Sequence, residues 1–252
     1  MRHATSIGKS QSTKFYDKLK IFAIVLIFTT GCNSLTWKNL TAKIYELKFS
    51  AVGDIMVHSS LLTSAYKKDC KCYDFQETFD EVKPLLKESD FSIGNLETTF
   101  PKEKSEFSGF PSFGSPRSLA TSLKNAGFNI LTTANNHCLD KGLSGALNTL
   151  KVLDEEKIAH TGTSVKKMIS EKNQNFIILE KNNIRFALFS YTQFLNGQSV
   201  PKGIEVNFIQ KEKIQKDLRE AKSYKIDFII IFFHFGKEYE KFPNKYQKEI
   251  VE

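Results

Sequence analysis

From residue 47 onward, short apolar runs alternate with longer stretches in which apolar residues recur every three or four positions. The short runs are rich in isoleucine, phenylalanine and valine, which favour strands. They predict strands at residues 47–52, 91–93, 129–132, 176–179, 184–191 and 226–233. The longer stretches predict helices at residues 75–87, 117–126, 143–156 and 209–223. This alternation is typical of an α/β domain with buried strands.

One pair of predicted strands has no helix between its members. Residues 176–179 and 184–191 flank the sequence Glu180-Lys181-Asn182-Asn183, which is typical of a hairpin turn. We therefore expect an antiparallel pair beside parallel ones, in a mixed sheet or in two sheets.

The first 31 residues have the pattern of an export signal, in which a basic segment precedes the apolar run 21–28. Eight apolar residues are too few to span a membrane, which takes about 20. Gly31-Cys32 resembles a bacterial lipobox, in which Cys32 is lipidated. Thr29 stands where lipoproteins usually have leucine, so the alternative is a plain secretory signal in which Cys32 is incidental. We expect a signal peptide at residues 1–31, a tether at 32–46 and one domain at 47–252, located in the cell envelope.

Net charge changes once the leader is set aside. The whole chain carries a formal charge of +8, and residues 1–31 contribute five positive charges and one negative charge to it. The remainder therefore carries +4, which is too little to indicate a nucleic-acid-binding protein.

Three further cysteines remain in the predicted domain. Cys70 and Cys72 either form a disulfide or stay as surface thiols, and they lack the second pair that a structural zinc site needs. We expect Cys138 to pack near the functional site rather than act as a nucleophile. The segment 101–116, with three phenylalanines, either walls a cleft or packs onto the domain.

Polar side chains follow four of the predicted strands: Asp54, Asn95 with Glu97, Asn136 with His137, and His234. Ligands of α/β sheets bind beyond the carboxyl ends of strands, where loops converge. The donors are oxygen and nitrogen atoms without thiolate, a set that suits Mn, Fe, Zn or Mg. Each residue alone is better explained by a turn, a cap or a core hydrogen bond. The four segments together predict a metal site.

The order and spacing of several motifs resemble the capsule-synthesis CapA (poly-γ-glutamate) family, from about Lys48 to the end of the chain. The motifs are Gly53-Asp54-Ile55-Met56, Gly94-Asn95-Leu96-Glu97, Ala134-Asn135-Asn136-His137 with Asp140 and Gly142, His160-Thr161-Gly162, and His234-Phe235-Gly236-Lys237-Glu238-Tyr239. That family belongs to the calcineurin-like metallophosphoesterase superfamily. The resemblance implies two packed mixed β-sheets flanked by helices, with one or two divalent ions (Mn, Fe or Zn).

The resemblance also implies roles for individual residues. The metal ligands would be Asp54, Glu97, Asn136 and His234. His137 would be the acid that meets the leaving oxygen, and Asn95 would orient a ligand or the substrate. His160 and Glu238 are expected at the cleft, His160 in a mainly structural role. The expected partners are an anionic polymer or phosphoester substrate, and the membrane through the lipid anchor. Nucleic acid is not expected, and the oligomeric state is not predicted.

Two departures from the superfamily pattern limit these implications. The first motif lacks its histidine, because Ile55 and Met56 follow Asp54, and no Gly-His-x-His-type motif follows His234. We therefore expect a C-terminally incomplete domain. The expected function is capsule or poly-γ-glutamate synthesis or export by an exported, lipid-anchored protein with a phosphoesterase-like hydrolase site. The alternatives are a non-catalytic surface lipoprotein that binds an anionic polymer, and an inactive fragment of a longer CapA protein.

Overall fold

The computed structural model describes residues 44–166 and 175–252 of the chain. The predicted signal peptide, Cys32 and nearly all of the predicted tether lie outside these residues. Within the described ranges, no helix has both the length and the apolar character needed to cross a membrane. The described residues belong to one compact unit.

The first sheet is parallel throughout. Its strands are β1 (Phe49–Ile55), β4 (Phe91–Leu96), β5 (Ile130–Thr132) and β6 (Ala159–Thr161), in the order β1-β4-β5-β6. The segments between them hold α1 (Ser59–Ala65), α2 (Gln76–Phe79), α3 (Lys83–Lys87), α4 (Ser118–Ala126) and α5 (Gly142–Glu155). Parallel neighbours need such crossover connections, so all four strands end at the same edge of the sheet.

The second sheet is mixed. Its central strand β9 (Ile184–Thr192) pairs antiparallel with β8 (Phe176–Lys181) and parallel with β11 (Phe228–His234). The predicted hairpin is confirmed, although its turn is shorter than expected, because only Asn182 and Asn183 lie outside the strands. Both have left-handed backbone angles, with φ of 54° and 60°, as a two-residue hairpin turn requires. Helix α6 (Lys211–Lys222) packs its apolar face onto this sheet through Ile214 and Ala221.

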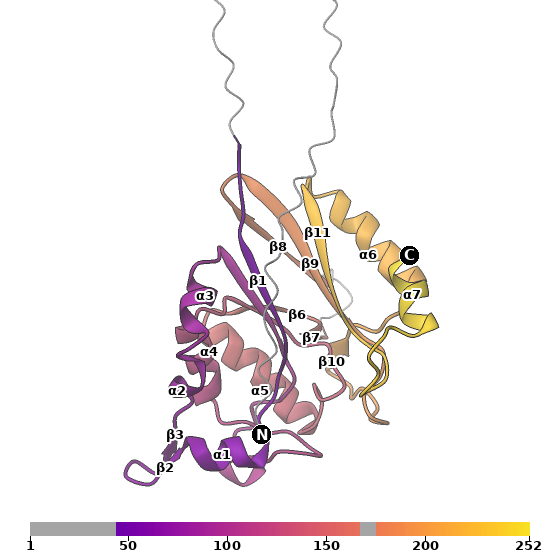
Figure 1. The fold of residues 1–252 in the computed structure, drawn as a ribbon. Coiled ribbons are helices and arrows are strands. Elements are labelled where there is room, and N and C mark those ends of the chain that lie inside the picture. Colours follow the sequence, from indigo (N-terminus) through magenta and orange to yellow (C-terminus); the bar gives the residue numbers. More distant parts are fainter. Residues whose placement is uncertain (1–43, 167–174) are drawn as a thin grey trace, which may run out of the picture. The chain divides into compact units, whose positions relative to one another are not determined.

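The two sheets face each other across a shared core, and Figure 1 shows them side by side, with the helices outside. Phe186 of β9 is fully buried there, with its ring centroid 5.2 Å from that of Phe49 and 4.9 Å from that of Phe91. It also stacks on Phe228 of its own sheet, at 5.3 Å. Fully burying a phenylalanine contributes about 1.5–3 kcal/mol. The prediction of an α/β fold with two packed sheets is confirmed, although only one of the sheets is mixed.

Some local predictions were wrong. The helix expected at residues 75–87 is two short helices, α2 and α3. Pro84 in the first turn of α3 has no amide hydrogen, and its ring would clash with the carbonyl of Asp80 in one continuous helix. The sequence pattern also missed a short pair formed by β7 (Thr163–Val165) and β10 (Ile204–Val206).

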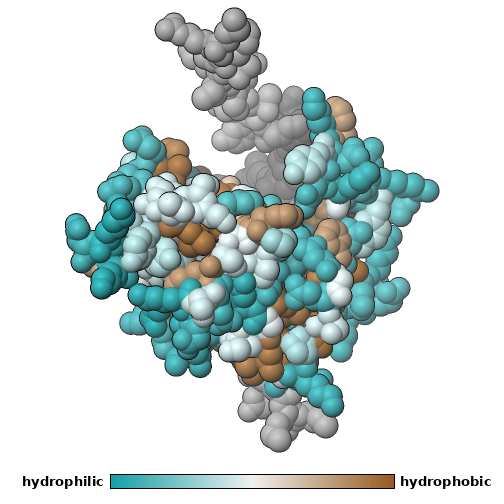
Figure 2. Space-filling view, turned by 90° about the horizontal axis from the view of Figure 1, so that it is seen from below, coloured by the Kyte–Doolittle hydropathy of each residue, from teal (hydrophilic) through white to brown (hydrophobic). Residues whose placement is uncertain are grey.

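The remaining short elements lie outside the two sheets. A hairpin of β2 (Tyr66–Lys67) and β3 (Cys72–Tyr73) carries a disulfide between Cys70 and Cys72, one of the two outcomes expected for these cysteines. A 3-10 turn (Lys104–Glu106) and the C-terminal helix α7 (Lys245–Val251) complete the elements. Figure 2 views the molecule from the end where β1 and β11 finish, and shows small separate hydrophobic patches on a mostly hydrophilic surface.

Candidate metal centre

Two neighbouring parallel strands bring the first part of the site together. Asp54, near the end of β1, is the register partner of Asn95 in β4, after a shift in register between Ala51 and Asp54. Glu97 follows directly after β4 and is only 5% exposed. Because both strands end at the same edge, the two carboxylates and the amide meet there.

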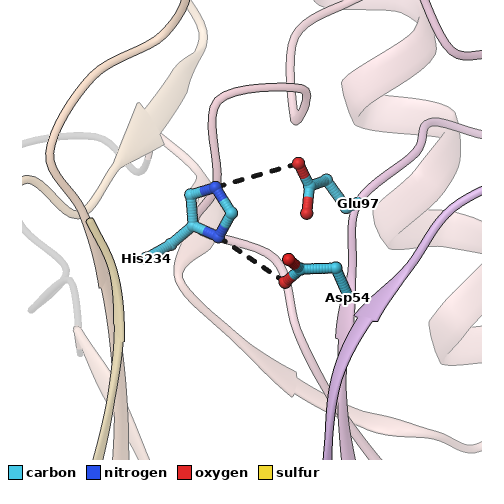
Figure 3. A group of neighbouring side chains, drawn as sticks. All are labelled: Asp54, Glu97 and His234. Atoms are coloured by element: carbon cyan, nitrogen blue, oxygen red, sulfur yellow. Dashed lines mark ion pairs between the residues drawn. The ribbon is translucent and has the colours of Figure 1, made fainter. Parts of the chain in front are cut away.

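The second sheet contributes an imidazole to the same place. His234 is the last residue of β11, and its side chain points toward Asp54 and Glu97 (Figure 3). Its Nδ1 atom lies 3.7 Å from Oδ1 of Asp54, and its Nε2 atom lies 3.8 Å from Oε1 of Glu97. One donor atom from each of these three residues lies within 4.8 Å of the other two. The group therefore has the compactness that a shared cation needs.

Two asparagines complete the inner part of the site. The Nδ2 atom of Asn95 donates to Oδ1 of Asp54 at 2.7 Å, and its Oδ1 atom accepts hydrogen bonds from Thr132 and Asn135. These bonds fix the amide, so Asn95 holds the Asp54 carboxylate in place. The Oδ1 atom of Asn136 lies 2.8 Å from Nε2 of His234, which puts a further neutral oxygen donor beside the imidazole.

His137 lies at the buried side of the cluster. Its Nδ1 atom is 2.7 Å from Oδ2 of Asp140, and its Nε2 atom is 4.0 Å from Oε1 of Glu97. Phe113 packs edge-on against the imidazole, with 4.7 Å between ring centroids. The Asp140 contact fixes the ring orientation, so Nε2 is the atom directed at the carboxylates.

Burial and crowding of acids perturb the site's ionisation. The pKa of Glu97 is raised to about 8, chiefly by burial and then by the nearby negative charge of Asp54. Burial also lowers the pKa of His234, against the attraction of Asp54. Buried carboxylates are costly unless a cation compensates them, and neutral imidazole is the form that ligates metals. Carboxylate, amide oxygen and neutral imidazole together fit a divalent ion such as Mn, Fe or Zn.

Glu238 and His160 were both expected at the cleft, and the structure places only Glu238 there. Glu238 lines a cavity of about 280 Å³ together with Asp54, Glu97 and His234, so it lies beside the cluster. His160 does not join them, because its Nε2 atom is 3.1 Å from Oδ1 of Asp154 and its side chain lines a different small cavity. Its place in the middle of β6 rather than past the strand's end accounts for the difference.

Three residues at the site were not among the predicted site residues. Asp140 accepts from the His137 ring and from the backbone amide of Phe113, and Asn135 donates to Asn95 and to the Leu96 carbonyl. Asn196 lies near both Asn136 and His137, at 3.2 Å and 3.5 Å. Asp140 and Asn135 stand inside the sequence motifs, which was a usable signal. Asn196 lies in a loop after β9, outside every sequence motif, so no sequence signal pointed to it.

The remaining cysteine prediction is confirmed. Cys138 is a free, buried thiol, and burial raises its pKa to about 12. A thiol held in its neutral form is a poor nucleophile. The residue therefore packs beside the site, as expected, without a chemical role.

Two packed sheets whose strand ends present carboxylate, amide and imidazole donors define an α/β protein with a candidate divalent-metal centre. The family described as bacterial capsule synthesis protein PGA_cap matches residues 48–252, and the chain belongs to this family. It is 25% identical to the capsule biosynthesis protein CapA of Bacillus anthracis and 23% identical to the PGA biosynthesis protein CapA of Bacillus subtilis (strain 168). Each match covers 92% of this chain, but only 57% and 60% of those relatives.

Among solved structures, the NAD nucleotidase of Haemophilus influenzae matches 65% of this chain and 29% of its own, at 20% identity and a TM-score of 0.47. By the two CapA matches, the chain spans less than two thirds of the length of those relatives.

Proposed function

We propose that this chain is an exported, lipid-anchored protein of capsule or poly-γ-glutamate biosynthesis, with a metal-dependent hydrolase site of the phosphoesterase type. One observation carries the metal site: donor atoms of Asp54, Glu97 and His234, from two different sheets, converge within 4.8 Å. Membership of the capsule synthesis family supports the biological setting. The signal-like residues 1–31 and the lipobox-like Cys32 support export and anchoring.

Asp54, Glu97 and His234 would hold the ion, with Asn136 contributing its amide oxygen. When bound, a divalent cation polarises a phosphoryl or carbonyl oxygen and lowers the pKa of water. Asn95 keeps the Asp54 carboxylate in position through its 2.7 Å hydrogen bond. The cavity beside the cluster is where we place the phosphoester or anionic polymer.

His137 is the proton carrier in this proposal. The carboxylate of Asp140 accepts from Nδ1 and can balance the charge of an imidazolium. The Nε2 atom then faces the Glu97 side of the cluster and can donate its proton to the oxygen that leaves. Phe113 packs against the ring and keeps water from that side of it.

A second candidate function is a non-catalytic protein that binds one cation and an anionic polymer. Across residues 44–166 and 175–252, one group of at least three His, Cys, Asp or Glu donors is close enough to hold an ion. A single compact group suits one ion better than the pair that clamps attacking and leaving oxygens in two-metal hydrolases.

Metal content and hydrolysis, measured together, test the proposal. We expect at least one tightly bound transition metal per chain and Mn-dependent hydrolysis of a generic phosphodiester. Asp54→Ala and His234→Ala should each weaken metal binding by about 100-fold or more, because loss of an outer-shell partner alone costs about 10–100-fold. Asp154→Ala and His160→Ala are matched controls, because they alter an Asp–His pair outside the cluster and should leave metal binding unchanged.

The outcomes separate the candidates. Less than one bound metal and no hydrolysis would overturn the enzyme proposal, and unchanged binding in Asp54→Ala and His234→Ala would overturn the site. Bound metal without hydrolysis supports the non-catalytic candidate. A lipid mass shift on Cys32 tests anchoring separately.

A further inference from the structure

A second and larger cavity lies away from the cluster. Its volume is about 1100 Å³, and it shares no lining residue with the cavity beside Asp54 and Glu97. Its walls come from α6, from β10 and the residues on either side of it, and from Lys166 and Asn175. Figure 1 labels α6, β10 and β7, which Lys166 follows. Sites for small ligands usually enclose about 300–1,000 Å³, so this cavity can accept a segment of a longer molecule.

Cationic side chains dominate the lining. Five line the cavity, against the two acids Glu205 and Glu220; they are Lys166, Lys202, Lys213, Lys216 and Arg219. The cavity at the cluster has the opposite character, with three acids and one lysine. The second cavity therefore attracts an anion directly, whereas the cavity at the cluster would do so only with a cation bound among its acids.

One of the five cations is anchored to the protein. The Nζ atom of Lys213 lies 2.8 Å from Oδ2 of Asp217, which is 2% exposed and also accepts from the hydroxyl of Tyr191. Lys213 therefore neutralises a buried acid and forms part of the wall. Burial of Asp217 under this lysine keeps its negative charge away from anything in the cavity.

The other four cations are available to a ligand. Lys166, Lys202, Lys216 and Arg219 are exposed, and within the described part of the chain none of them forms an ion pair. On α6, Lys216 and Arg219 are three positions apart and so lie along one face of the helix, about 4.5 Å apart along its axis. Lys166 and Lys202 lie on other parts of the cavity wall, so the four cations can contact successive charges of a linear anion.

We propose that this cavity binds a segment of a linear polycarboxylate. This inference rests on the proposed function, because it gives the anionic polymer a site separate from the metal cluster. Aliphatic residues, among them Val200, Pro201 and Ile204, line the cavity beside the cations and suit the methylene groups between carboxylates. Phe208 is the one aromatic residue in the described lining, and single-stranded nucleic acids need several such faces for base stacking. The cations line a hollow, whereas a bilayer surface meets a flat or convex face.

The test is binding of a labelled γ-glutamate oligomer of defined length to the full chain, with a chelator present. The variant Lys216→Glu with Arg219→Glu should lower affinity by about tenfold or more, and binding to the original chain should weaken as salt is raised. The matched control is Lys211→Glu with Lys222→Glu. It makes the same change of charge on the same helix, at exposed positions outside the lining, and should change affinity by about twofold or less.

Failure of this inference can be told from failure of the metal site. Absence of oligomer binding, equal losses in the two charge-reversal variants, or tighter binding of single-stranded DNA or anionic vesicles would overturn the polycarboxylate site. Metal binding measured on the same samples reports on the cluster alone. Oligomer binding that persists in Asp54→Ala supports a site independent of the cation.

Discussion

The Nε2 atom of His234 lies 2.8 Å from Oδ1 of Asn136, and this contact joins the end of β11 in one sheet to the loop after β5 in the other. The two residues are 98 positions apart in the chain. Their contact exists only when the sheets are packed face to face, so the integrity of the site depends on the core formed around Phe186.

Metal binding should depend on pH through Glu97. Its pKa is about 8, so in the metal-free protein the carboxyl keeps its proton up to that pH, and a ligating carboxylate must lose it. Apparent Mn affinity should therefore rise with pH up to about 8 and level off above it. Burial lowers the His234 pKa, so this ring releases less than a full proton on binding near neutral pH. Calorimetry in buffers of different ionisation enthalpy should show about one proton released at pH 7, chiefly from Glu97.

The same shift acts on the stability of the metal-free chain. A carboxyl whose folded-state pKa is raised favours folding while it is protonated, and this contribution is lost between its ordinary value of 4.5 and about 8. Equal Mn affinity at pH 6.5 and 8.5 would contradict the predicted pH dependence of metal binding.

Asp140→Asn should slow hydrolysis without removing the metal. The Asp140 carboxylate lies 2.7 Å from the His137 ring and fixes its orientation, whereas none of its contacts is to Asp54 or His234. We expect about a 10–100-fold loss of kcat, as for other residues that orient a functional imidazole. Gln198→Ala is the control, since Gln198 donates to the other oxygen of Asp140 and does not contact His137. Parallel losses in metal content and kcat would show that Asp140 supports the cluster as a whole.

Gly162→Ala should destabilise the domain. Gly162 has φ of +118°, and a Cβ atom there would lie 2.4 Å from the backbone nitrogen of Ala134. Strained backbone and overpacking each cost about 1–3 kcal/mol, so we expect a loss above ~2 kcal/mol in denaturant unfolding. Gly53→Ala is the control, because nothing lies within 4 Å of its Cβ position and its φ is not left-handed. A Gly162→Ala chain as stable as the Gly53→Ala chain would disprove the steric argument.

The Cys138 thiol should resist alkylation in the folded protein. It is 6% exposed, and its pKa is raised to about 12, so both access and thiolate are lacking at pH 8. Iodoacetamide followed by peptide mass mapping should label Cys138 only after the chain is unfolded. Rapid labelling of the native protein would place this thiol at the surface.

Much of the fold could be predicted because most of its longer strands are short runs of apolar residues, which the sequence shows directly. The asparagine pair between β8 and β9 is a local turn signal, and the structure uses it as one. The break between α2 and α3 was missed because apolar periodicity continues across it, although Pro84 marks the place. Short strands such as β7 and β10 have only three residues each, too few for a periodic pattern, and their pairing depends on distant parts of the chain.

The candidate site was predictable for a different reason. Parallel strands end at one edge of the sheet, so polar residues at their carboxyl ends lie close together, as Asp54 in β1 and Asn95 in β4 do. The partner of a given atom is a matter of tertiary packing. Asn196 reaches Asn136 and His137 from a loop 59 residues further along, and nothing in its neighbours indicates this. His160 belongs to one of the sequence motifs, but its position in the middle of β6 directs its side chain toward Asp154 and away from the cluster.

The division of the cluster between two sheets has a thermodynamic consequence. Any cation held by Asp54 and Glu97 on one side and by His234 on the other is a cross-link that only the folded domain can form. At a free ion concentration about a hundred times the Kd, such a link would add about 2.7 kcal/mol to the free energy of unfolding. For the exported protein that we propose, the metal supply of the medium would then help set the fraction of chains that are folded.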